Sequence, residues 1–139
     1  MRDWSRLLHT IAKLSYEQIV TEGKEKVSRV LNIIEKYSDS DSAPITLVGL
    51  AAYTATVDDE LSERELKLVK DIIGVGEKEF KDFIHQVEKD GKIVRDLVEI
   101  ANSMTRDEMD DFSYLLGLIF AVDGVISDKE LAFIKKLCD

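Results

Sequence analysis

The sequence predicts an all-α fold, a compact bundle of seven or eight helices built from an internal duplication. Apolar residues recur at helical spacing along most of the chain. Alternation at period two is absent, and no Asn-Gly or Asp-Gly pair joins two strand-like runs. One helix–turn–helix motif also occurs twice. With 139 residues and a hydrophobic content of 45%, the chain suits a single domain, residues 1–139, that buries about two-thirds of its unfolded surface.

The repeated motif spans Ala55–Leu66 in its first copy and Phe120–Leu131 in its second, without a gap. Position 58 corresponds to position 123, an offset of 65 residues. Identical or similar residues pair Val57 with Val122, Asp58 with Asp123, Leu61 with Ile126, Ser62 with Ser127, Arg64 with Lys129, Glu65 with Glu130 and Leu66 with Leu131. We therefore expect repeat halves at about 44–73 and 106–138, preceded by N-terminal helices at 3–37.

Each copy is typical of a helix, a tight acidic turn and a second helix. Ser62 and Ser127 are favourable N-cap residues, and Glu65 and Glu130 follow three residues later, which completes an S-x-x-E capping box in each copy. Gly124 suits a left-handed turn position, because a residue without Cβ adopts positive φ at little cost. Capping and solvation alone account for most of the motif, and this structural interpretation stays open.

Capping does not explain Asp58 and Asp123, which stand where the preceding helix ends and its dipole disfavours negative charge. The duplication is able to bring four acids together about a pseudo-two-fold axis: Asp58, Glu65, Asp123 and Glu130. Carboxylates about 4 Å apart repel by roughly 4 kcal/mol at an effective dielectric constant near 20. A cation or a shared proton would relieve that repulsion. An all-oxygen set of ligands favours a hard divalent cation, Ca²⁺ or Mg²⁺.

The second copy has the pattern A-x-D-G-x-I-S-x-x-E after an apolar helix with small residues. This doubled pattern, in an acidic all-helical chain of this length, resembles the bacterial tellurite-resistance TerB-like family. The resemblance implies a compact helical domain, a stress-response role, no established enzymatic activity and an acidic metal-binding surface. Carried over by position, the implied metal ligands are Asp58, Glu65, Asp123 and Glu130. The first copy departs from the pattern at Thr56, where the family has Ala, and at Asp59, where it has Gly.

The charge balance narrows the class of partner. With 28 acidic and 19 basic residues the net charge is −9, so phosphates and anionic lipid repel the chain and we expect no nucleic-acid partner. The longest apolar run, Tyr114–Val122, is too short to span a bilayer, so we expect no membrane insertion. We expect a protein partner of unknown identity, with a homodimer left open. A structural protein–protein interaction domain without metal is the alternative function.

Other features argue against catalysis and secretion. The sequence has no G-x-S-x-G, no Cys/His pair at a plausible spacing and no Gly-rich phosphate loop after a strand, so we expect no enzyme. The lone Cys138 forms no internal disulfide, and His9 and His85 do not make a zinc site without carboxylates. The N-terminus lacks the apolar region of a signal peptide, which favours a cytoplasmic protein.

Helix boundaries follow from glycines, caps and the only proline. We expect a break at Gly23 between two N-terminal helices, although one continuous helix stays open, and a loop at Ser38–Ser42. The remaining helices are expected at 44–57, 62–73, 77–89, 92–104, 106–122 and 128–137. Small residues such as Gly49 and Gly117 in two of these predict that helices 44–57 and 106–122 form the central crossing pair.

Overall fold

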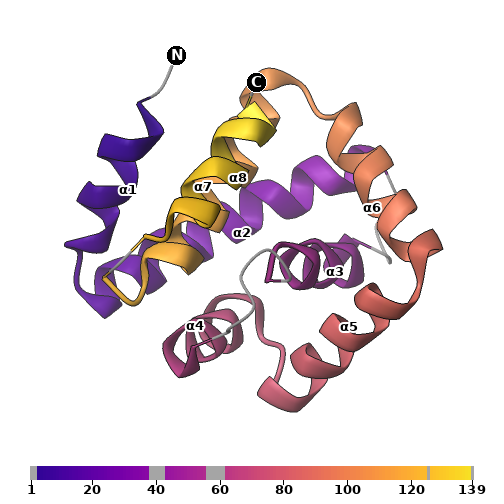
Figure 1. Ribbon diagram of the computed structural model, residues 1–139, viewed down its shortest axis with the longest axis horizontal. Coiled ribbons are helices and arrows are strands. Elements are labelled where there is room, and N and C mark those ends of the chain that lie inside the picture. Colours follow the sequence, from indigo (N-terminus) through magenta and orange to yellow (C-terminus); the bar gives the residue numbers. More distant parts are fainter. Residues whose placement is uncertain (1–2, 38–42, 56–61, 125, 139) are drawn as a thin grey trace.

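The computed structural model describes residues 3–37, 43–55, 62–124 and 126–138 (Figure 1). Within these ranges the protein is all-helical, with no strand, which confirms the fold class. The helices are α1 (Trp4–Ala12), α2 (Tyr16–Tyr37), α3 (Ala43–Ala55), α4 (Glu63–Ile73), α5 (Glu77–Lys89), α6 (Gly91–Ser103), α7 (Arg106–Ala121) and α8 (Asp128–Cys138). No helix in these ranges is both long enough and apolar enough to cross a membrane.

The duplication is visible in the helix bounds. Shifted by the repeat offset, the bounds of α4 coincide with those of α8, and α3 falls within α7. Pro44 lies in the first turn of α3, and Gly74 closes α4 in the left-handed conformation with φ 88°. The two halves therefore share a helix–turn–helix unit whose second helix begins at the same repeat position.

The predicted break at Gly23 is wrong, because α2 continues through that residue. The chain instead breaks at residues 13–15, between α1 and α2. Ser15 and Gln18 form a reciprocal pair there: the Ser15 backbone N donates to Gln18 Oε1 at 2.9 Å, and the Gln18 backbone N donates to Ser15 Oγ at 3.2 Å. This S-x-x-Q capping box is a stronger signal for a helix start than an isolated glycine is for a helix end.

Gly23 has a packing role instead of a breaking role. It is buried, and a Cβ added there would lie 2.9 Å from Ile72 Cγ2 and 3.1 Å from Ile72 Cδ1. Ile72 belongs to α4, and its branched side chain has little rotational freedom. The absence of a side chain at Gly23 therefore allows α2 and α4 to approach closely.

We expect Gly23→Ala to destabilise the protein by about 1–2 kcal/mol, although alanine gains about 1 kcal/mol of helix propensity over glycine. In an Ile72→Ala background the same substitution should stabilise, because the clashing Cγ2 and Cδ1 atoms are gone. Urea unfolding of the four proteins of this double-mutant cycle measures the coupling directly. Equal effects of Gly23→Ala in both backgrounds would show that Ile72 does not limit the approach of the two helices.

The central crossing pair also differs from expectation. Helix α2 packs extensively against α7, α3 and α4, and so occupies the centre of the bundle (Figure 1). The small residues predicted to join α3 to α7 meet other helices. A Cβ at Gly117 would lie 2.6 Å from Leu8 Cδ2 of α1, and a Cβ at Gly49 would lie 3.4 Å from Leu97 Cδ2 of α6. The small residues therefore predicted correctly that helices come close at these positions, but they did not predict which helices do so.

One continuous core joins the helices. Its largest fully buried side chains are Phe80, Phe112, Phe120, Leu8, Ile11, Ile19, Ile34, Leu47, Leu68, Leu115, Leu116 and Leu118. They come from six helices, α1 to α5 and α7, and α7 contributes the most. Burial of α7 on nearly all sides fixes the position of the turn that follows it, where the second copy of the acidic motif begins.

Candidate functional site

Both acidic motifs form the capping boxes that the sequence predicted. At the start of α4, the Glu65 backbone N donates to Ser62 Oγ at 3.0 Å, and the Ser62 backbone N donates to Glu65 Oε1 at 3.5 Å. At the start of α8, the Glu130 backbone N donates to Ser127 Oγ at 3.1 Å, and the Ser127 backbone N donates to Glu130 Oε1 at 2.9 Å. Gly124 has φ 80°, as expected of the turn glycine. Local sequence therefore orients both glutamates.

Burial distinguishes these two glutamates from ordinary capping residues. Glu65 is 5% exposed and Glu130 is 3% exposed. A capping glutamate performs its role equally well at the surface, so nothing in the capping box requires this burial. Removing a carboxylate from water disfavours its charged form unless a partner compensates.

The electrostatics show that the two motifs lie close together. The pKa of Glu65 is raised to about 8. Burial is the largest cause, and the negative charge of Glu130 is the next. Asp123 adds a smaller effect in the same direction, while hydrogen bonds from Ser62 oppose the shift. Glu130 and Asp123 thus both act on Glu65, and the fourth predicted site residue, Asp58, lies outside the described residues.

The chemistry of this group suits a hard cation, but the described side chains do not complete a ligand shell. Two buried carboxylates with mutual repulsion are oxygen donors of the kind that Ca²⁺ and Mg²⁺ prefer. Among the residues that the structure describes, no three Asp, Glu, His or Cys side chains converge as a ready metal-binding group. Further oxygen donors, from the backbone, water or Asp58, would have to join Glu65 and Glu130.

A third buried glutamate, Glu108, has the opposite electrostatic environment. It occupies the same capping-box position, with the Thr105 backbone N donating to its Oε1 at 2.9 Å. Lys36 Nζ donates to its Oε2 at 2.8 Å, and the Tyr37 hydroxyl donates to its Oε1. The hydrogen bond from Lys36, followed by those from Thr105 and Tyr37, lowers the pKa of Glu108 to about 2. Glu108 is therefore a stably ionised link between the end of α2 and the start of α7.

The capping role of Glu108 could be predicted, but its partners could not. Lys36 and Tyr37 stand about seventy positions earlier in the chain, and no motif connects them to Thr105-x-x-Glu108. A similar point holds for Asp111, whose partner no local motif indicates. Its Oδ1 accepts a hydrogen bond from Lys26 Nζ at 2.9 Å, which joins α2 to α7 a second time.

The fold and the site define the class of protein as an all-α bundle. In it, a capping box that occurs twice buries two glutamates, Glu65 and Glu130. No protein-family model matches the sequence, and neither the curated proteins nor the solved structures contain a match. Any assignment of function therefore rests on the residues of this chain and on the motif resemblance.

Proposed function

We propose that this protein is a TerB-like binding module of the bacterial cytoplasm, linked to tellurite resistance or a related stress response, whose acidic turns bind a divalent cation. The observation that carries the proposal is the pair Glu65 and Glu130. Both residues stand at equivalent repeat positions and are buried, and the charge of Glu130 makes ionisation of Glu65 less favourable. The role is one of binding rather than catalysis.

The physical argument starts from the unfavourable state of the pair without a cation. A carboxyl group with a pKa of about 8 holds a proton at neutral pH, so Glu65 is buried in its neutral, protonated form. A divalent cation would stabilise both charged glutamates at once, and the oxygen donors favour Ca²⁺ or Mg²⁺ over Zn²⁺ or Cu²⁺. We propose Asp123 and Asp58 as the further ligands. Tellurite is an oxyanion, and this acidic group would repel it, so the ligand is a cation.

The test is a titration of chelator-treated protein with Ca²⁺, Mg²⁺, Mn²⁺ and Zn²⁺, followed by amide NMR shifts and thermal unfolding. We expect the amide signals of Glu65, Asp123 and Glu130 to shift together at micromolar to millimolar Ca²⁺ or Mg²⁺. At a concentration 100 times Kd, the free energy of unfolding should rise by about 2.7 kcal/mol. Asp123→Asn should weaken the response, and Glu65→Gln combined with Glu130→Gln should abolish it.

A charge-matched control is Asp107→Asn, which removes an exposed acid from the first turn of α7. This variant should respond to the cation as the unmodified protein does. If the control loses the response equally, the cation is screening net charge rather than occupying a site. No shift and no stabilisation up to millimolar cation would reject the metal proposal in favour of the second candidate function.

That second candidate is a protein–protein interaction domain without metal. One observation favours it: Ile45, in the first turn of α3, is 62% exposed although it is a large apolar side chain. Exposed apolar side chains beside a groove are characteristic of surfaces that bind other proteins. A functional interface at Ile45 does not depend on whether the acidic turns bind a cation.

A further inference from the structure

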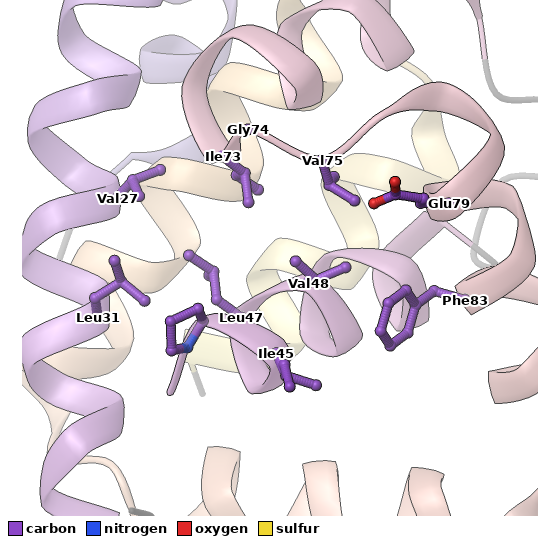
Figure 2. A pocket seen from close by; sticks show the side chains of 11 residues that line it. Val27, Leu31, Ile45, Leu47, Val48, Ile73, Gly74, Val75, Glu79 and Phe83 are labelled. Atoms are coloured by element: carbon purple, nitrogen blue, oxygen red, sulfur yellow. The ribbon is translucent and has the colours of Figure 1, made fainter. Parts of the chain in front are cut away.

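An open apolar groove lies between α2, α3 and the connection from α4 to α5 (Figure 2). Figure 2 shows side chains of α2 on one side, those of α5 on the other and α3 between them. The groove has a volume of about 240 Å³, and the side chains that shape it include Val27, Leu31, Ile45, Val48, Val75 and Phe83. None of the described residues of the acidic turns line it.

The groove exposes apolar surface that the fold leaves uncovered. Ile45 is the most exposed large apolar side chain of the described residues, and the next, Val98, is 37% exposed and lies on α6 outside the groove. Burying apolar surface is favourable by roughly 25 cal/mol for each Å². The groove therefore offers binding energy to a segment that places apolar side chains against Ile45, Val48 and Phe83.

One end of the groove carries the negative charge of Glu79, the single charged residue among the described residues of the lining, and this residue is exposed. Its carboxylate forms no hydrogen bond or ion pair with any other residue that the structure describes. Glu79 lies in the first turn of α5, where the helix dipole favours an acid, so the carboxylate stays ionised at the mouth of the groove. An exposed carboxylate of this kind favours a basic side chain on the occupant.

We infer that the groove binds the apolar face of a basic amphipathic helix from a partner protein. Two or three large apolar side chains of that helix occupy the space between α2, α3 and α5, and a lysine or arginine lies beside Glu79. This is the helix-in-groove mode of recognition, in which apolar anchors provide affinity and charge fixes orientation. The inference is independent of the proposed cation site.

The charge and size of the groove favour this occupant over two others. A second copy of the chain would bring a net charge of −9 against an equal charge, and it would place acids near Glu79. Pockets for small molecules enclose roughly 300–1,000 Å³ and bury most of the ligand. This groove is smaller and open to one side, so it suits a few side chains of a larger partner.

The experiment uses the full chain and three synthetic peptides labelled with a fluorophore. The first is an amphipathic helix with Leu and Phe at i, i+3, i+4 and i+7 and Lys elsewhere. The second is a scrambled peptide of the same composition without an apolar face, and the third replaces each Lys with Glu. Fluorescence anisotropy measures affinity, and NMR locates the contact. We expect the first peptide to bind most tightly and to shift the signals of Ile45, Val48 and Phe83.

Two pairs of variants separate the apolar and the charged contributions. Ile45→Asp should weaken binding of the first peptide at least about tenfold, while Val98→Asp, which introduces the same charge outside the groove, should leave it nearly unchanged. Glu79→Lys should weaken the basic peptide and strengthen the acidic one. Asp82→Lys makes the same charge change at an exposed position of α5 outside this groove and should not reverse the preference.

Several results would overturn the inference. Equal affinity for the scrambled peptide, or equal losses in Ile45→Asp and Val98→Asp, would mean that general charge attraction explains the binding. A concentration-dependent dimer that Ile45→Asp converts to a monomer, seen by sedimentation, would assign the groove to a second copy. Thermal unfolding of each variant checks that it folds, and if Ile45→Asp does not fold, Ile45→Ser replaces it with the same expected direction.

Discussion

Replacing Glu65 with glutamine should stabilise the protein above about pH 5, by an amount that grows to about 4 kcal/mol near pH 8 in the presence of a chelator. The sign follows from proton binding. The pKa of Glu65 is raised from 4.5 to about 8 in the folded protein, so between these values the folded state holds a proton that the unfolded state has released. The free energy of unfolding therefore falls as the pH rises through this window, by up to about 1.4 kcal/mol for each pH unit.

Glutamine is a suitable replacement because it keeps the capping box while removing the charge. Urea unfolding at pH 5, 7 and 9 should show a decline for the unmodified protein and a flatter profile for Glu65→Gln. Glu63→Gln is the matched control: it removes an exposed acid from the same first turn of α4 and should leave the decline in place. Parallel profiles for Glu65→Gln and the unmodified protein would show that burial and Glu130 impose no charge penalty on Glu65.

The corresponding substitution at Glu108 should have the opposite sign. Glu108→Gln is expected to destabilise the protein by about 1–2 kcal/mol at pH 7, because hydrogen bonds to a charged acceptor become hydrogen bonds to a neutral one. Hydrogen bonds from Lys36, the Thr105 backbone and Tyr37 lower the pKa of Glu108 from 4.5 to about 2. Its contribution is therefore present above about pH 4.5 and disappears as the pH falls through 2.

The measurement is the difference in free energy of unfolding between Glu108→Gln and the unmodified protein at several pH values. That difference should shrink toward zero between pH 4.5 and pH 2. Lys36→Met is a useful companion, since it removes the exposed charged donor but keeps Tyr37 and should cause a smaller loss than Glu108→Gln. A difference that does not change across the acidic range would mean that the charge of Glu108 does not matter and that only its capping hydrogen bonds do.

The two substitutions illustrate what could be predicted from the sequence. Glu65 and Glu108 each occupy the third position of a capping box, a pattern that can be recognised in the local sequence. The opposite shifts of their pKa values come from the tertiary structure: burial, Glu130 and Asp123 raise the pKa of Glu65, whereas hydrogen bonds that include those from Lys36 and Tyr37 lower the pKa of Glu108. The local sequence pattern determines the position of each glutamate in its helix. The charged residues that surround its carboxylate are brought there by tertiary packing, which has no signal in the local sequence.

The same division applies to the fold. Helix starts with a serine or threonine cap and helix ends with a glycine were predicted within one or two residues, as for α4 and α8. The break between α1 and α2 was misplaced because Gly23 is a contact position rather than a terminus. Pairing of α3 with α7 was also wrong, since a small residue indicates that some helix comes close but not which one. For the site, the repeat predicted that the four acids meet. Glu130 and Asp123 act electrostatically on Glu65, but no three acids of the described residues converge as a metal-binding group, and Asp58 lies outside those residues.

The packing of α1 has a consequence for synthesis of the chain. Trp4, Leu8 and Ile11 are buried, and α1 packs against α7 and α8, which the ribosome makes much later than α1. Translation therefore delivers the apolar stripe of α1 long before its docking surface exists, and in that interval the stripe is available to chaperones or to neighbouring nascent chains. Glu65 meanwhile has ordinary acidity, because the helix that carries Glu130 has not yet emerged. The acidic pair therefore forms only after both copies of the repeat have been made and have packed together.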